Sequence, residues 1–581
     1  MNALQRVLRS RAALFAPPLL LTACLCLWAV DVLNWDEWLI WTTTLEKLRA
    51  GGLTLSDIIL QNNEQRSAIV RIVGLGFFPL FRLARWPELA AIVLMAGGSV
   101  LLAGRLAGLT FPATTDQTSG HTPHSRVDRR LLLVFSLLGF SLLQWETFSV
   151  GINTSVIIPV LGLWAGVCLV WSRQRLSLAR LGVLFLVGLL PAFSFANALF
   201  YWPCLAPLVA LRAGPRRRAW ALTTLWLVSG ALVWAGYFHG YVKPGHHPSI
   251  LRALLSPHIL AGYFTTYLGG ALVGDRNLLP LALLSGAFAL IALATLIRAA
   301  WRAGAEARAS LPPWLCVVSF TLMTAAATAA ARGGFGLGQA QESRYATFST
   351  PLWMALAALA FLHWQKLSPT ARRWLGRGFA LCAGFFALST VLAAVVLYHR
   401  APRLERARLE LFRLTEPANL RVVFPDPAFV IANMPFFLEL RAGIYRDVLP
   451  LADYRPGARA EGAFRVISWT EVSGRVPGFL LLGDALGRAG TKVLVRAGES
   501  GAERIVGLGQ TDETGHFELF LPENALPKGP QQIFAAVLDT DGRTLHSLGP
   551  EDGAAVQNAG RAVARFELDH HFFIPGATQT R

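Results

Sequence analysis

The sequence predicts a polytopic α-helical membrane protein with a small all-β domain at its C-terminal end. The 581 residues are 54% hydrophobic and only 15% charged, with a mean hydropathy of +0.46; soluble domains carry more charge. Several apolar runs approach the roughly 20 residues that a spanning helix needs. After about residue 461 these runs give way to short alternating segments, a pattern typical of β-strands.

Basic residues set the expected topology. Arg6, Arg9 and Arg11 precede the first apolar run, so the positive-inside rule places the N-terminus in the cytoplasm. Most other basic residues of the hydrophobic part lie between later runs, so the net charge of +18 reflects topology and predicts no nucleic-acid partner. An odd number of about 11 spans puts the C-terminal tail outside the cytoplasm. The spans are residues 12–30, 87–107, 131–148, 152–171, 181–196, 199–211, 219–237, 278–297, 313–331, 346–363 and 379–397.

The transmembrane domain is expected to cover residues 1–398. Residues 31–66 form its first external loop, and residues 67–83, apolar but interrupted by Arg71 and Arg82, fit an interfacial helix. Residues 251–270 are ambiguous and fit a re-entrant segment. A juxtamembrane linker, residues 399–460, holds an amphipathic helix at 404–414.

The β domain is expected to span residues 461–581 as a small sandwich. Glu513-Thr514-Gly515 and Thr540-Asp541-Gly542 are turn signals between its strands. The strand candidates are residues 464–469, 479–482, 492–496, 517–521, 533–538 and 564–568.

Uncommon polar residues gather in the segments expected to face outward. Polar groups at span ends are costly unless paired or hydrated, so they predict a polar cavity at this face. The segments are residues 34–38, 61–66, 144–147, 193–197, 241–248 and 341–345.

Two adjacent acids lie just past the first span. Asp36 and Glu37 lie between Trp35 and Trp38. Adjacent carboxylates raise each other's proton affinity, so one of them can act as a general base. The alternative is an aromatic belt with solvated acids.

Two further groups have two interpretations each. Asn63, Glu64 and Arg66 can orient a sugar or phosphate, or cap the helix that follows. Arg344 lies on the side expected to face outward, where the positive-inside rule disfavours a cation. In one interpretation it binds a lipid-linked phosphate while Tyr345 packs on lipid or sugar; in the other it pairs with Glu342.

The loop with Lys243, His246 and His247 can bind phosphate or metal, or be solvated; adjacent histidines without a third ligand are a weak metal signal, and no metal is expected. Glu146 and Asn197 are substrate-binding candidates or hydrogen-bonded span ends. The sequence contains no Walker motif and no GxSxG elbow, which argues against ATP-driven transport within this chain.

Over residues 1–397 this layout resembles the C-type (GT-C) fold of polytopic glycosyltransferases, which use polyprenyl-phosphate-linked sugars. More narrowly, the motifs resemble a little-characterised bacterial group. That group commonly has Asn-Glu-His-Arg, where this chain has Gln65 at the histidine position, and Glu-Asn where this chain has Thr147 after Glu146. The first departure weakens a histidine-assisted mechanism. The motifs are Trp35-Asp36-Glu37-Trp38, Asn63-Glu64-Gln65-Arg66, Gln144-Trp145-Glu146, residues 193–197 and Ser343-Arg344-Tyr345.

The resemblance implies an inverting, metal-independent transferase at the outer face of the bacterial inner membrane. Asp36 would be the catalytic base, supported by Glu37 or Glu64, and Arg344 would bind the donor phosphate. The partners would be membrane lipid, the lipid-linked sugar, and a glycan, lipid or protein acceptor. Two alternatives stay open: a non-enzymatic polysaccharide carrier, flippase or assembly subunit, and a glycan polymerase.

Overall fold

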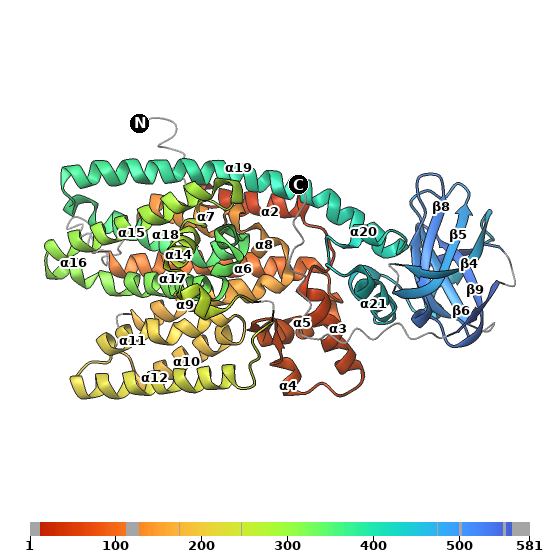
Figure 1. Cartoon of the computed structure of the whole chain (residues 1–581), viewed down its shortest axis with the longest axis horizontal. Helices are drawn as coiled ribbons and strands as arrows, with labels where there is room; N and C mark the ends of the chain where they lie inside the picture. The colour runs from red at the N-terminus through yellow and green to blue at the C-terminus, as the bar shows by residue number, and fades with distance from the viewer. Residues whose placement is uncertain are drawn as a thin grey trace, which may run out of the picture.

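The protein is a long helical bundle with a β domain at one end (Figure 1). A computed structural model describes residues 12–111, 127–172, 175–245, 247–472, 475–498, 502–549 and 553–559. Within these ranges nine helical segments are long and apolar enough to cross a membrane, the architecture of a polytopic helical protein. They are Arg85–Thr110, Arg129–Ser149, Gly151–Val170, Arg216–Phe238, Arg276–Arg302, Leu311–Phe335, Ser343–Lys366, Pro369–Arg413 and Pro427–Tyr445.

Eight of these segments coincide with expected spans. Three other expected spans form shorter helices: α2 (Ala16–Trp28), α10 (Leu178–Ala192) and α11 (Tyr201–Arg212). The ambiguous stretch 251–270 forms two helices, α13 (Ile250–Leu254) and α14 (Pro257–Gly269).

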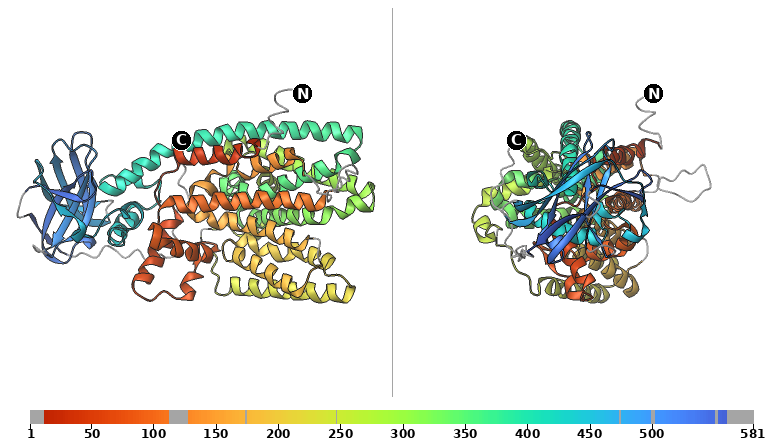
Figure 2. Two further views of the ribbon diagram at one scale, coloured as in Figure 1. Left: turned by 180° about the vertical axis from the view of Figure 1, so that it is seen from behind. Right: turned by 90° about the vertical axis from the view of Figure 1, so that its right-hand side faces the viewer.

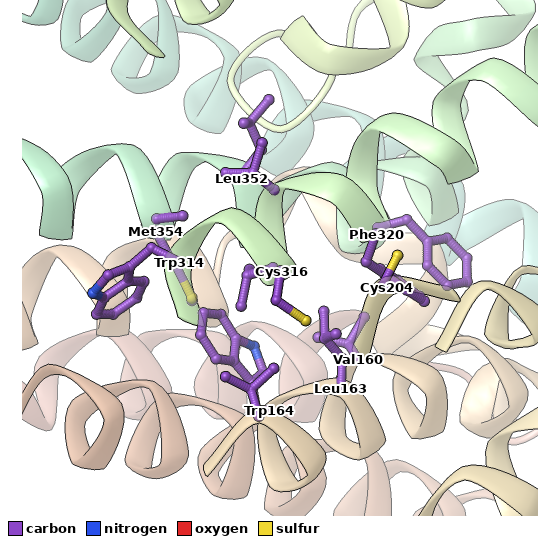
Figure 3. Close-up of a cluster of buried hydrophobic side chains, with 14 of the residues drawn as sticks. Val160, Leu163, Trp164, Cys204, Trp314, Cys316, Phe320, Leu352 and Met354 are labelled. Carbon is purple, nitrogen blue, oxygen red and sulfur yellow. The ribbon is translucent and has the colours of Figure 1, made fainter. Parts of the chain in front are cut away.

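Four helices pack around one apolar core (Figure 3). They are α9 (Thr154–Val170), α11, α17 (Leu311–Arg332) and α18 (Ser343–His363). The rings of Trp164 and Trp314 meet edge to face, with centroids 6.2 Å apart, and both are fully buried. Most of α18 is buried, so it is the central helix, and its first turn is held in place by its neighbours.

A compact unit follows α2 at the end of the bundle nearest the β domain (Figure 1). It consists of α3 (Asp36–Arg49), α4 (Leu55–Ile58), a hairpin of β1 (Gln61–Asn62) and β2 (Gln65–Arg66), and α5 (Ala68–Phe81). Helix α5 coincides with the expected interfacial helix. Its Gly74 lies directly against the Trp41 ring of α3, where a Cβ would overlap the ring.

The bundle is completed by α6 (Arg85–Thr110), α7 (Arg129–Gly139), α8 (Trp145–Ser149), α12 (Arg216–Phe238) and α15 (Leu279–Arg302). The longest helix of the described residues, α19 (Pro369–Arg413), is continuous over 45 residues. The expected separate helix at 404–414 is therefore the C-terminal end of α19, which continues through Pro402. Leu404 and Leu411 are buried there in a core shared with Phe520 of the β domain.

The linker after α19 is also largely helical. It contains α20 (Pro417–Leu420) and α21 (Pro427–Glu439), and α21 contacts three strands of the β domain. The β domain therefore rests on α19 and α21, as the left view of Figure 2 shows.

The β domain is built from two sheets whose inner faces share one core. One sheet has the order β4–β5–β8; the other has the order β3–β10–β9–β6–β7, with β11 on β9. Five expected strands are present, and residues 564–568 lie outside the described ranges. The strands are β3 (Arg455–Pro456), β4 (Gly462–Val472), β5 (Val476–Ala485), β6 (Lys492–Gly498), β7 (Arg504–Gln510), β8 (His516–Pro522), β9 (Gly529–Leu538), β10 (Thr544–Ser547) and β11 (Ala554–Asn558).

Candidate functional site

Asp36 begins helix α3 directly after a strained residue. Trp35 has a φ of 49° and a ψ of −120°, a conformation that costs a bulky residue roughly 1–3 kcal/mol. Its backbone N–H donates to the carbonyl of Val423 over 2.6 Å, which fixes it to the segment after α20. The strain therefore lies next to Asp36, and the Trp35 ring stays exposed.

The Asp36 carboxylate lies among one amide and two guanidinium groups. The Asn62 side chain hydrogen-bonds to it, and the charges of Arg344 and Arg332 act on it. Burial raises the pKa of Asp36 above its usual range, and Glu37 raises it further, while the two arginines and Asn62 lower it without offsetting the burial. A carboxylate with a raised pKa accepts a proton more readily than an ordinary aspartate, which suits the role of a general base.

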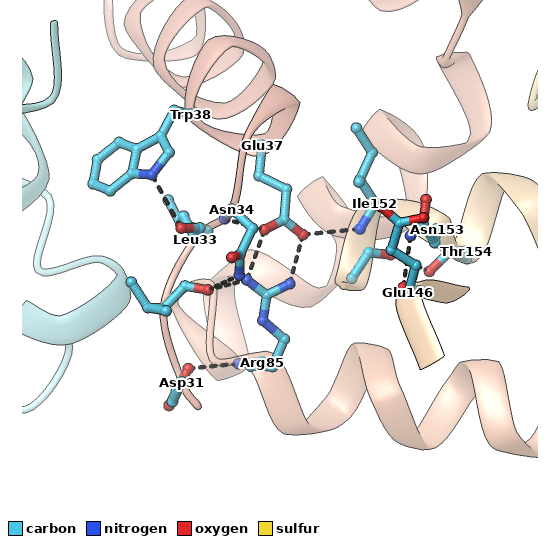
Figure 4. Close-up of polar contacts among 12 residues, drawn as sticks. Asp31, Leu33, Asn34, Glu37, Trp38, Arg85, Glu146, Ile152, Asn153 and Thr154 are labelled. Carbon is cyan, nitrogen blue, oxygen red and sulfur yellow. Dashed lines mark hydrogen bonds and ion pairs between the residues drawn. The ribbon is translucent and has the colours of Figure 1, made fainter. Parts of the chain in front are cut away.

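Glu37 forms a fully buried ion pair with Arg85 (Figure 4). Both of its oxygens lie 2.6 Å from guanidinium nitrogens of Arg85. The backbone N–H groups of Asn34 and Ile152 also donate to it, over 2.6 and 2.9 Å. With its oxygens occupied in this way, Glu37 fits a role in positioning α3 rather than direct catalysis.

The β1–β2 hairpin carries Glu64 at its tip. Asn63 has a φ of 53°, which Asn tolerates better than most residues. The Glu64 carboxylate pairs with Arg332, at the end of α17, and lies 3.5 Å from Nε2 of His247. Since Arg332 also acts on Asp36, this cluster continues the Asp36 site.

Arg66 anchors the hairpin. Its Nε donates to the Tyr237 carbonyl over 2.6 Å and one amino group donates to the Ile59 carbonyl over 2.9 Å; the other donates to the carbonyl of His239. Two of these bonds attach the hairpin to the end of α12. The three backbone carbonyls together explain why the Arg66 guanidinium can be buried. At the start of α5, the Ser67 side chain makes no capping hydrogen bond.

Arg344 lies in the first turn of α18, where a cation opposes the helix dipole. Glu146 compensates: it lies 3.4 Å from the guanidinium and accepts from the Arg344 N–H over 3.3 Å. The guanidinium also covers the Tyr345 ring, 5.6 Å from its centroid. The alternative prediction, an ion pair between Arg344 and Glu342, is wrong, because Glu342 pairs with Arg276.

Four residues that the sequence reasoning did not select as site residues belong to this network: Asn62, Arg85, Arg332 and Arg400. Arg400 donates to Oδ1 of Asn34 over 3.4 Å, covers the Trp145 ring at 5.0 Å, and lies close enough to Glu146 for their charges to interact. The signal that selected Arg344, an arginine at an outward span end, applies equally to Arg332 and Arg400.

Several predicted site residues are buried or bonded to other groups. The Trp38 ring is buried against Phe437 and Tyr345 is buried, so neither presents a face to lipid. Lys243 donates to the Pro248 carbonyl over 2.7 Å. Asn197 is half-buried in the turn η4 (Ala196–Phe200). His246 lies outside the described residues.

The described residues contain no group of three His, Cys, Asp or Glu side chains placed to hold a metal ion. Comparisons with protein-family models, with curated proteins and with solved structures find no match to this chain.

Proposed function

We propose that this protein is an inverting glycosyltransferase that moves a sugar from a polyprenyl-phosphate donor to a glycan, lipid or protein acceptor. The observation that carries the proposal is Asp36, a carboxylate with a raised pKa beside Arg344 and Arg332 at the end of an apolar bundle. The motif resemblance to GT-C glycosyltransferases supports the same assignment. The site would lie on the outer face of the bacterial inner membrane, with the N-terminus cytoplasmic and the β domain extracytoplasmic.

The reaction needs one base and one group that stabilises the leaving phosphate. Asp36 takes the proton of the acceptor hydroxyl as its oxygen bonds to the anomeric carbon. The bond from that carbon to the phosphate oxygen breaks, and the polyprenyl phosphate leaves with the electron pair. Arg344, one third of whose side chain is exposed, stabilises the negative charge that develops on the phosphate.

The arrangement of the other charges supports these roles. Glu146 holds Arg344 through both its backbone and its side chain, and Glu64 holds Arg332. Each arginine is thereby oriented before substrate arrives, which lowers the cost of ordering it in the transition state.

The test is mass spectrometry of surface glycans and lipids from four strains: intact, gene-deleted, Asp36→Asn and Glu439→Gln. Glu439 is an exposed acid of α21 and serves as the control. Deletion and Asp36→Asn should remove the same sugar-sized mass, with Asp36→Asn protein still present in the membrane, and Glu439→Gln should not. If Asp36→Asn leaves the glycans intact, Asp36 is not the base, and a carrier or assembly role accounts better for the deletion.

A further inference from the structure

A cavity of about 630 Å³ lies at the junction of the bundle and the β domain. Asp36 does not line it. The lining comes from the end of α2, the start of α6, the C-terminal part of α19, the 444–447 segment, the first residue of β6 and the last residue of β7. Its volume is within the range of small-molecule binding sites.

Aromatic rings and paired charges line this cavity. Trp28, Trp86 and Tyr398 provide flat apolar faces. Asp31 pairs with Arg446 over 2.5 Å, and the Nε of Arg408 lies 3.0 Å from both oxygens of Glu405.

The charges of the lining balance. Asp31, Glu405 and Asp447 carry three negative charges, and Arg408, Arg446 and Lys492 carry three positive charges. A phosphate or an acidic polysaccharide gains little from such a lining, because each of two guanidinium groups already has a carboxylate partner. A neutral polyhydroxylated ligand fits better: its hydroxyls can donate to the carboxylates and accept from the cations, while its C–H faces lie on the aromatic rings.

The cavity is joined to the candidate active site by a short chain of contacts. Asp31 Oδ1 accepts from the backbone N–H of Arg85 over 3.0 Å, and the Arg85 side chain holds Glu37, the neighbour of Asp36. Arg400 donates to Asn34, and the next residue, Ala401, lines the cavity. A ligand in the cavity is therefore bound by the same elements that position the base.

We propose that this cavity binds neutral sugar units of the acceptor glycan, remote from the hydroxyl that reacts. This inference rests on the proposed transferase function and extends it to the acceptor. Binding remote sugar units supplies free energy for orienting the reacting end, and the β domain, through Lys492 and Gln510, forms part of the acceptor site.

The test uses the full-length protein in lipid nanodiscs on a printed array of neutral oligosaccharides, with phosphorylated and uronic-acid oligosaccharides beside them. Trp86→Ala is the test variant; its side chain is 42% exposed, so the fold should survive, as gel filtration checks. Trp220→Ala is the matched control, because Trp220 is an exposed tryptophan of α12 and does not line the cavity.

The expected result is binding to neutral oligosaccharides, roughly tenfold weaker for Trp86→Ala and unchanged for Trp220→Ala. Phosphatidylcholine vesicles with and without a neutral glycolipid then distinguish a lipid-linked from a free glycan. Preference for acidic oligosaccharides, binding to none of the neutral ones, or equal binding by the two variants would overturn the proposal. Its failure is distinct from that of the transferase assignment, which depends on the Asp36→Asn strain.

Discussion

Replacing Glu37 by Gln should destabilise the protein far more than replacing Glu439 by Gln. Both acids form a two-pronged ion pair with an arginine, Glu37 with Arg85 and Glu439 with Arg49. They differ in burial: the Glu37 side chain is 0% exposed and the Glu439 side chain 54%. The two ion pairs therefore have the same chemistry, and they differ in burial and in the two backbone N–H groups that donate to Glu37.

The expected magnitudes follow from burial. Glu37→Gln removes the carboxylate that hydrogen-bonds to the buried Arg85 guanidinium. Breaking a buried ion pair in this way costs roughly 3–5 kcal/mol of unfolding free energy, although the charges of Glu88 and Asp31 still act on Arg85. The glutamine also weakens the hydrogen bonds that the carboxylate accepts from the Asn34 and Ile152 backbone. The exposed pair contributes under about 1 kcal/mol.

The assay is thermal unfolding of the purified full-length variants in one detergent, followed by gel filtration of the fraction that stays folded. Glu37→Gln should unfold well below the wild type, and Glu439→Gln should match it. The double variant Glu37→Leu/Arg85→Met should unfold at a higher temperature than Glu37→Gln, because it buries no guanidinium that has lost its hydrogen-bonded carboxylate partner. Equal unfolding temperatures for Glu37→Gln and Glu439→Gln would refute the reasoning.

Two further predictions concern the base and the packing beside it. Because a base acts only when deprotonated, the rate of transfer should fall as the pH drops through the Asp36 pKa, at a pH above the usual aspartate range. Arg344→Gln removes a charge that lowers this pKa, so the fall in a pH–rate profile should move to higher pH. A profile that does not move would contradict the interaction between Arg344 and Asp36. Gly74→Ala should destabilise the protein by about 1–3 kcal/mol, because the added methyl group overlaps the Trp41 ring. Gly76→Ala is the control on the same helix: its methyl group meets open space and should be tolerated. Thermal unfolding of the two variants compares their stability.

Hydrophobic pattern predicted most of the helical architecture, because length and apolarity are local properties of the chain. It did not predict where α19 ends. A sequence change at residue 398 from apolar to charged marks where the helix leaves apolar surroundings, but a helix can continue past that point if its next turns are buried elsewhere, as Leu404 and Leu411 are. Strand β7 was missed because Gly507 and Gly509 lower its β propensity.

The candidate site was predictable only in part. Polar residues at span ends indicated which segments meet at one end of the bundle, and the structure brings Asp36, Glu146 and Arg344 together there. The sequence gives no account of which charges pair, because pairing depends on side-chain direction within the folded protein. Glu37 and Arg66 therefore looked equivalent to their neighbours, although each is engaged in buried contacts.

The unbroken course of α19 fixes the orientation of the β domain by helix geometry. Each residue of an α-helix advances the chain by about 1.5 Å and turns it by about 100°. One residue inserted into α19 just before Arg400 would therefore rotate everything beyond it by that angle, carrying Glu405 and Arg408 out of line with Trp28 and Trp86. The number of residues in one helix thus determines whether the two halves of the cavity face each other.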